Sequence, residues 1–365
     1  MNSFISVVVP QFAALDNVAL LSDGKRPEID RYKILPTLEN IYDISEKFDP
    51  TCLRGAKSVF FLSVGPHNAN LILQTLGCVG PEQVYILITD DEVNRFRRCR
   101  QLFGRLRVSK RYRIDQDVLQ VLEAVDNYFT LREPWGNVLE SILEKRLFVS
   151  DCTSFRPLSI IRRELAELAE TDPSRNDNAL NILNDSRPTK SFDRLLFVLA
   201  CYALIFRSSS LKSITKIRIY LWMPPRAWRI TSQIERALKK LIVATLRSRG
   251  IDLMFCDIYR MPLEEYKTLL SKIDIMPLRV RGGGGGAMML LSQGGTVVFK
   301  KNSLNQRAFG NYFEGNKLPK YSSYFGFFWN LPDLLGSRTE FRKAFKEGAL
   351  KELEIKERFY ASFFG

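Results

Sequence analysis

The sequence predicts an α/β protein built on parallel sheets. Short apolar runs rich in branched side chains, such as residues 217–221 and 273–280, are typical of strands that are buried on both faces. Each run leads into a glycine, proline or polar loop and then into a segment with helical periodicity. Five consecutive glycines, at residues 282–286, separate one such strand from a helix. This alternation is the pattern of a doubly wound sheet with helices on both faces.

The composition favours a folded chain with an anionic partner. The 365 residues suffice for two domains, and 45% apolar and 12% aromatic residues can fill two cores. The formal net charge is +14, from 54 lysines and arginines against 40 acidic residues. Such an excess suits a phosphate-bearing ligand, an anionic membrane surface or a nucleic acid. The six cysteines are widely spaced and the chain has one histidine, so reduced thiols and no metal site are expected.

No segment is expected to span a membrane. The longest apolar run, residues 195–206, is shorter than a bilayer crossing requires and predicts a buried helix. The N-terminus lacks the basic region of a signal peptide and predicts a strand at residues 4–9. The expected location is therefore the cytoplasm.

The first domain is predicted over residues 1–172. An apolar strand at residues 59–64 ends at a glycine-proline pair, and Asn68 can cap the helix that follows at residues 69–76. His67 lies in the loop between them. This histidine can be a general base or a polar loop residue.

Carboxylates follow the next predicted strand, at residues 84–88. That strand runs directly into Thr89, Asp90, Asp91 and Glu92. Parallel sheets place reacting groups at the carboxyl ends of their strands. The three acidic residues are therefore candidates for a general base, and the alternative is a capped, solvated turn.

A strongly basic stretch continues the first domain at residues 95–113. It contains nine lysines or arginines and no acidic residue, interleaved with Phe96, Leu102, Phe103 and Leu106. This pattern favours an amphipathic basic surface for anionic lipid, and a solvated face is the alternative. A nucleic acid is the less favoured partner, because no nucleic-acid motif occurs and stacking aromatic residues are few.

The second domain is predicted over residues 178–335, after a polar linker at residues 171–178. Its first strand, at residues 179–183, is followed by a loop in which hydroxyl and basic side chains can form an anion cradle. The loop residues with this chemistry are Ser186, Arg187, Thr189 and Lys190. An aromatic segment at residues 321–329 predicts either core or an interfacial patch. A charged helix at residues 336–365 is expected to return to the first domain.

The glycine-rich stretch has the most specific chemistry. Glycines adopt positive φ easily and let successive backbone N–H groups converge on an anion. A helix predicted from Ala287 would direct its positive end to the same place, which suits a diphosphate. We therefore place a donor site at Gly284, Gly285, Gly286 and Ala287. A flexible linker is the alternative, and no P-loop pattern is present.

Four segments resemble one glycosyltransferase family. They are PPRAW from Pro224, MPLEEYKTLLSKIDI from Met261, GGGAMMLLSQGGTVVF from Gly284 and LNDSRPTKSFDRLL from Leu183. They resemble the bacterial TDP-4-acetamido-4,6-dideoxygalactose transferases of enterobacterial common antigen synthesis, which have the GT-B fold. The glycine turn is longer here than in that family, Thr89 and Asp90 replace a Trp-Gly pair, and no histidine follows the Ser186 loop.

The resemblance implies two Rossmann-like domains with a cleft between them. It implies transfer of a sugar from a nucleotide-diphosphate donor to a glycan or lipid-linked glycan acceptor, in bacterial surface polysaccharide synthesis at the inner face of the plasma membrane. The glycine turn and the Ser186 loop would hold the diphosphate without a metal or other cofactor, and Asp90, Asp91 or Glu92 would accept the acceptor's proton. Two alternatives stay open: a non-catalytic basic module for nucleic acid or membrane, and a GT-B-like pyruvyl transferase.

Overall fold

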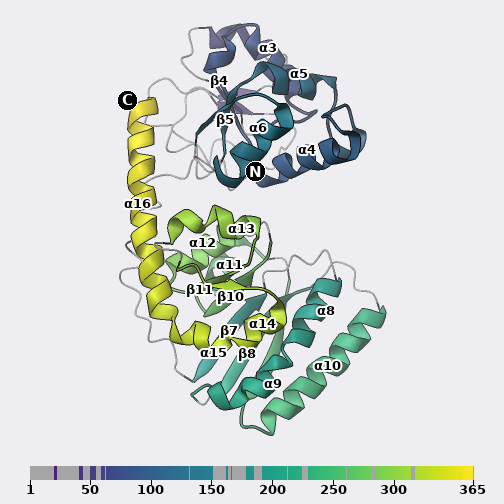
Figure 1. Cartoon of the computed structure of the whole chain (residues 1–365), viewed down its shortest axis with the longest axis vertical. Coiled ribbons are helices and arrows are strands. Elements are labelled where there is room, and N and C mark those ends of the chain that lie inside the picture. The colour runs from purple at the N-terminus through teal and green to yellow at the C-terminus, as the bar shows by residue number, and fades with distance from the viewer. Residues whose placement is uncertain are drawn as a thin grey trace. The chain divides into compact units, whose positions relative to one another are not determined.

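The computed structural model divides the chain into two compact units, Met1–Ile160 and Ile161–Gly365 (Figure 1). The predicted strand at residues 4–9 and all but the last residue of the predicted linker lie outside the described residues. The structure describes residues 20–22, 41–43, 50–54, 59–61, 63–130, 132–150, 162, 166, 178–184, 191–211, 213–223, 229–259, 261–280, 284–313 and 317–364.

The first unit contains a parallel sheet whose strand order follows the chain. Its strands are β3 (Val59–Phe61), β4 (Val84–Leu87), β5 (Asn127–Phe129) and β6 (Phe148–Ser150). Val84, Ile86, Tyr128 and Phe129 are fully buried, which is why the central strands are almost purely apolar. A separate parallel pair consists of β1 (Leu20–Ser22) and β2 (Ile41–Asp43).

The helices of the first unit pack in two pairs, α3 against α5 and α4 against α6. The α4 helix buries Phe96 and Cys99 and ends where Gly104 adopts the left-handed φ of 73°. Asn68 precedes α3, but its side chain bonds to Gly65 N and Ser63 O instead of capping the helix. The helical segments of this unit are η1 (Pro50–Leu53), α3 (Ala69–Leu76), η2 (Pro81–Gln83), α4 (Asp90–Phe103), η3 (Lys110–Tyr112), α5 (Gln116–Ala124), η4 (Arg132–Gly136) and α6 (Asn137–Leu143).

The second unit contains a six-stranded parallel sheet in the order β12-β11-β10-β7-β8-β9. Counted along the chain this is 6-5-4-1-2-3, the order of dinucleotide-binding sheets, with its reversal between β7 and β10. The sequence located all of these strands except β12 to within a few residues. They are β7 (Ala179–Asn184), β8 (Lys216–Trp222), β9 (Asp252–Ile258), β10 (Ile275–Leu278), β11 (Thr296–Lys300) and β12 (Lys320–Tyr321).

Helices cover both faces of this sheet. Val298 of β11 belongs to the core that the sheet shares with α8, α9, α10 and α14. Its neighbour Phe299 packs on Phe309 and Phe313 instead, with ring centroids 5.0 and 5.9 Å away. Successive strand residues point to opposite faces, so the sheet is doubly wound, as the sequence predicted. The helical segments are α8 (Ser191–Ala200), α9 (Ala203–Arg207), η5 (Ser208–Leu211), α10 (Arg229–Arg247), α11 (Leu263–Leu270), α12 (Gly284–Ser292), α13 (Leu304–Ala308), η6 (Gly310–Tyr312), α14 (Tyr324–Trp329), α15 (Leu331–Gly336) and α16 (Arg338–Phe364).

The first half of α16 packs on η6 and β11 of the second unit. The Arg338 guanidinium anchors its start by donating to the buried Asp274 carboxylate, 3.1 Å away. Gly348 permits close packing, because a Cβ there would lie 2.6 Å from the Tyr312 carbonyl oxygen. The predicted return of this helix to the first domain stays a prediction.

Two apolar segments are only partly buried. The helical stretch Phe192–Leu211 is long and apolar enough to cross a membrane, yet half of its most apolar window is buried within the unit. The prediction of a fully buried helix at residues 195–206 was therefore wrong. The sheet covers one side of this segment and leaves the opposite side exposed. The aromatic segment likewise divides, with Phe327 and Phe328 in the core and Phe325 and Trp329 exposed.

Candidate functional site

The reversal of strand order in the second unit creates the first part of the candidate site. Ile275 of β10 pairs with Ile182 of β7, so both strands end at the same edge of the sheet. In doubly wound sheets the connections after two such strands run to opposite faces, and ligands commonly bind at this switch point. The two segments that the sequence assigned to the donor follow these two strands along the chain. Ser186, Arg187, Thr189 and Lys190 themselves lie outside the described residues.

The glycine turn differs from its prediction in conformation. The α12 helix begins at Gly284, three residues before Ala287, and none of the described glycines of the turn, Gly284 to Gly286, has a positive φ. The expectation of positive φ at Gly284–Gly286 was therefore wrong, since glycine also adopts helical angles. The start of α12 can still bind an anion, because the first-turn N–H groups of a helix have no hydrogen-bond partner within the helix. Ala287 is fully buried, so its side chain belongs to the core.

The three described glycines of the turn differ in their surroundings. A Cβ at Gly286 would lie 2.6 Å from the Tyr266 hydroxyl of α11, so close helix packing explains that glycine. A Cβ at Gly284 would make ordinary contact with Phe309, 3.7 Å away. A Cβ at Gly285 would meet no atom within 4 Å. The protein's own packing therefore does not require glycine at position 285.

Backbone hydrogen bonds hold the strand end that leads into the turn. The Tyr321 hydroxyl donates to the Leu278 carbonyl at 3.1 Å, and the Asn305 amide donates to the Arg279 carbonyl at 2.8 Å. The backbone N–H of Asn305 donates to the Val280 carbonyl at 3.1 Å. Three successive carbonyls are thus fixed by side chains and backbone from β12 and α13. Sequence reasoning missed Asn305, because nothing local marks a buried asparagine that serves a distant strand.

A network of ion pairs joins α8, the helix that follows β7, to α10 and to the ends of β8 and β9. Arg194 of α8 is buried, and it donates to the Glu235 carboxylate at 2.8 Å and to Asp257 at 2.6 Å. It also donates to the Trp222 carbonyl at 2.8 Å, at the end of β8. Burial alone would lower the pKa of Arg194, but its bonds to the two carboxylates outweigh that effect and raise the pKa. Sequence reasoning missed this network, since its members are far apart in the chain.

In the first unit, the loops after β3 and β4 are held together by Glu92. Its Oε1 accepts a hydrogen bond from Val64 N at 3.0 Å, and its Oε2 accepts one from Thr89 N at 2.8 Å. Arg95 donates to the Val64 carbonyl at 3.0 Å. The structure therefore brings the loop of His67 and the acidic residues to one edge of the sheet.

The acidic residues lie in the first turn of α4 rather than in a loop. Glu92 is buried, burial raises its pKa, and both of its oxygens accept hydrogen bonds, so it is the cap of the turn. Asp91 is exposed, and the side chain of Asp90 lies outside the described part of the chain. His67 is exposed, with its Nε2 3.5 Å from the Ser63 hydroxyl. A base role for Asp90, Asp91 or His67 stays a prediction.

Replacing Glu92 with alanine tests the capping role. The change leaves the N–H groups of Val64 and Thr89 without their acceptor, so we expect the free energy of unfolding to fall by about 2–4 kcal/mol. Asp91→Ala, one residue away but exposed, is the control and removes at most about 1 kcal/mol of helix-dipole stabilisation. Denaturant unfolding measures both. Equal losses in the two variants would contradict the assigned role of Glu92.

The basic stretch forms the end of α4 and the loop that follows. Phe96 is fully buried, so its assignment to the basic surface was wrong, because it lies on the inner side of α4. Leu102 and Val108 are more than half exposed, and the Arg107 guanidinium lies 3.7 Å from the centroid of the Phe103 ring. Exposed apolar and basic side chains are thus adjacent here, as the amphipathic interpretation predicted.

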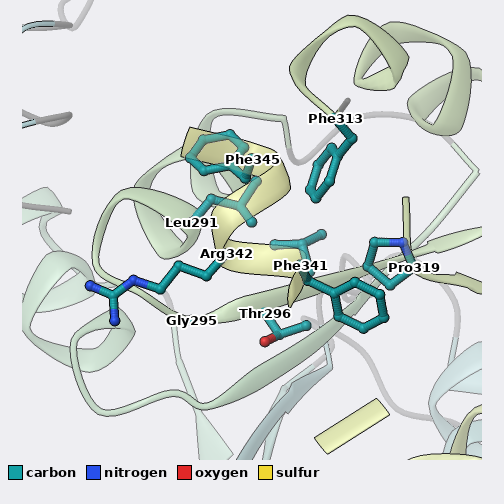
Figure 2. A pocket seen from close by; sticks show the side chains of 9 residues that line it. Leu291, Gly295, Thr296, Phe313, Pro319, Phe341, Arg342 and Phe345 are labelled. Atoms are coloured by element: carbon teal, nitrogen blue, oxygen red, sulfur yellow. The ribbon is translucent and has the colours of Figure 1, made fainter. Parts of the chain in front are cut away.

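A small cavity lies away from the candidate site. Figure 2 shows Phe313, Phe341 and Phe345 around it. It is lined by Thr296, the first residue of β11, and therefore lies at the sheet edge opposite the glycine turn. Its volume of about 10 Å³ is roughly that of one water molecule. It is too small for a sugar or a nucleotide.

Comparisons with known proteins concern the fold. No protein-family model and no curated protein sequence matches the chain. The solved structure named "Trehalose-6-phosphate from E. coli bound with UDP-2-fluoro glucose" is similar to this one, with a TM-score of 0.50 and 10% sequence identity, over 84% of this chain and 73% of that chain. A trehalose-6-phosphate synthase studied with bisubstrate glycomimetics has a TM-score of 0.49 and 12% identity, over 81% and 77% of the two chains. The first likeness, with the two parallel-sheet units, shows a GT-B-like fold.

Proposed function

We propose that the chain is a glycosyltransferase that uses a nucleotide-diphosphate sugar. The observation that supports this most directly is the reversal of strand order between β7 and β10, two strands that each precede a sequence expected to bind an anion. The structurally similar protein from E. coli is bound with UDP-2-fluoro glucose, a nucleotide sugar of this class.

The second unit would bind the donor. The first-turn N–H groups of α12 would face the diphosphate, and Gly285 would let the phosphate oxygens approach the backbone. Arg187 and Lys190, on the loop after β7, would offset the charge that develops on the leaving diphosphate. No metal or other cofactor has a part in this scheme.

The first unit would bind the acceptor. Asp91 is the preferred base, because it is exposed at the carboxyl edge of the sheet, whereas Glu92 is buried. The base would take the proton of the acceptor hydroxyl as its oxygen bonds to the anomeric carbon. The bond from that carbon to the diphosphate breaks, and the nucleoside diphosphate leaves.

The finer assignment rests on the sequence resemblance. It is transfer of 4-acetamido-4,6-dideoxygalactose or a related sugar to a glycan or lipid-linked glycan, in bacterial surface polysaccharide synthesis. The chain would work in the cytoplasm, and the basic surface at the end of α4 would contact the anionic inner face of the plasma membrane.

A panel of ligands tests the proposal. At about 100 times its dissociation constant, a bound nucleoside diphosphate adds roughly 2.7 kcal/mol to the free energy of unfolding. We expect a rise in unfolding temperature with UDP or TDP, measured by thermal shift, and the same rise in the presence of EDTA. Stabilisation by phosphoenolpyruvate alone would indicate the pyruvyl transferase instead. Stabilisation by oligonucleotides alone would indicate a non-catalytic binding module.

A further inference from the structure

The second unit has a stripe of exposed apolar side chains that are not part of its hydrophobic core. Five large side chains along α8 and α9 are between 37% and 60% exposed, although both helices contribute their other side to the core. Their spacings of four, three, three and four residues place them on one helical face. They are Phe192, Leu196, Leu199, Tyr202 and Phe206.

Aromatic rings extend the stripe onto the neighbouring helix α14, which packs on α8 and α9 (Figure 1). The ring of Tyr202 lies 5.6 Å from that of Phe206, and Phe206 lies 6.5 Å from Trp329. Trp329 in turn stacks on Phe325 at 5.8 Å. All four rings are more than one third exposed, so they form one continuous aromatic surface.

One basic side chain contacts this surface, and others are exposed on the neighbouring helix α10. The Arg207 guanidinium lies over the Trp329 ring at 5.6 Å. On α10, which packs along α8, Ile234 and Leu241 are exposed together with Arg236 and Lys240. The α8, α9, α10 and α14 helices contain two acidic residues, Asp193 and Glu235, and the Glu235 carboxylate is engaged by Arg194 and Lys239.

We infer that these residues form a docking surface for an anionic lipid bilayer, here called the aromatic–basic surface. It comprises the α8–α9 stripe, Phe325 and Trp329, Ile234 and Leu241, and the cations Arg207, Arg236 and Lys240. Tryptophan, tyrosine and phenylalanine rings favour the interfacial region of a bilayer, and leucine side chains can enter its acyl boundary. Arginine and lysine beside them are attracted to anionic headgroups.

Two other occupants fit the surface less well. A second copy of the chain would bring Arg236, Lys240 and Arg207 against their equivalents, and these helices offer no exposed acidic cluster to pair them. A membrane-spanning role conflicts with the buried side of the same helices, where Arg194 bonds to Glu235 and Asp257. Contact with the bilayer surface satisfies both the apolar and the basic residues.

The inference does not depend on glycosyl transfer. It also concerns residues separate from the basic surface of α4, which belongs to the first unit. Nucleotide-induced stabilisation and lipid binding can therefore be measured on the same variants, so that failure of one proposal is distinguishable from failure of the other.

Co-sedimentation of the full chain with vesicles tests the inference. We expect binding to phosphatidylcholine vesicles that contain phosphatidylglycerol, and little binding to phosphatidylcholine alone. The double variant Leu199→Gln with Phe206→Gln should bind about tenfold or more weakly, because its side chains can no longer enter the apolar region. Arg236→Glu with Lys240→Glu should remove the preference for anionic vesicles.

The controls separate this surface from general effects. Ile355→Gln changes a side chain of α16 that is 56% exposed, and it should bind vesicles like the parent. All substituted positions are exposed, so the unfolding temperature and the response to UDP or TDP should stay unchanged. Vesicle binding that is unaffected by the double variant, or lost only in Arg105→Glu with Arg107→Glu, would overturn the inference. A parent chain that is a dimer in solution and becomes a monomer in the double variant would also overturn it. So would tryptophan fluorescence that is quenched by a soluble oligosaccharide and not by lipid vesicles.

Discussion

Replacing Gly285 with alanine is expected to stabilise the second unit while it weakens the binding of a nucleoside diphosphate. Gly285 lies in the first turn of α12, and an added Cβ meets no protein atom within 4 Å. Alanine at an exposed helical position adds about 0.5–1 kcal/mol relative to glycine. A phosphate oxygen that approaches the backbone would collide with that same methyl group. We expect the dissociation constant to rise by about tenfold or more, which corresponds to roughly 1.4 kcal/mol.

The opposite signs of the two effects make this variant informative. A destabilised variant often loses its ligand merely because it unfolds, whereas Gly285→Ala should unfold at a higher temperature and still bind less. Gly336→Ala is the matched control, since Gly336 is also helical and also has open space around its Cβ. It should gain stability without any change in nucleotide affinity. Thermal unfolding and titration calorimetry measure the two quantities.

A Gly285→Ala variant that binds UDP or TDP as tightly as the parent would contradict the assigned donor site. The glycine turn would then be a helix start without a ligand. Gly285→Val should give a larger loss of affinity than alanine, because the branched side chain occupies more of the space above the helix end.

The largest expected loss of stability follows from Arg194→Met. The arginine side chain is 7% exposed, and its removal leaves the Glu235 carboxylate with Lys239 alone and takes a donor from the Trp222 carbonyl. Removing one partner of a buried ion pair costs about 3–5 kcal/mol. The control is Arg247→Met, which removes a surface bridge to Asp252 at 3.7 Å and should cost at most about 1 kcal/mol. Denaturant unfolding measures both variants.

The same network predicts a pH dependence. Burial alone would raise the pKa values of Glu235 and Asp257, but hydrogen bonds and charges from Arg194 and Lys239 lower them below 4.5 and 3.8 respectively. A carboxylate with a lowered folded-state pKa stabilises the fold above its ordinary pKa, and this contribution disappears as the pH falls through the folded-state value. The parent should therefore lose stability below about pH 4 more steeply than Arg194→Met. Parallel curves of unfolding free energy against pH would show that the network contributes nothing to acid sensitivity.

Local patterns were sufficient for the elements but not for their ends. The strands at residues 84–88 and 179–183 were predicted almost to the residue, because an apolar run bounded by turn residues specifies a buried strand. The start of α12 was predicted three residues late. Glycine is permitted in both a loop and a helix, so packing of α12 on α11 and β11 decided where the helix begins.

The candidate sites could be predicted only in part, for a similar reason. The sequence predicted an anion-binding segment after each of two strands, but it did not contain the strand order, and only the structure shows that β7 and β10 are neighbours. It also marked Glu92 only as a candidate general base, and it did not distinguish Arg194 from other charged residues. Their roles depend on Val64 and Asp257, which lie 28 and 63 residues away, and no local pattern encodes such pairs.

The sequence by itself determined the α/β class, the positions of most strands and helices, the glycine turn and the basic character of the chain. These properties depend on hydrophobic periodicity, turn residues and charge, which act over short distances along the chain. The tertiary structure alone decided the strand order, the capping role of Glu92, the buried ion network of Arg194 and the exposure of one side of α8 and α9. Each of these depends on which surfaces the sheets cover, and burial is a property of the assembled fold rather than of any single segment.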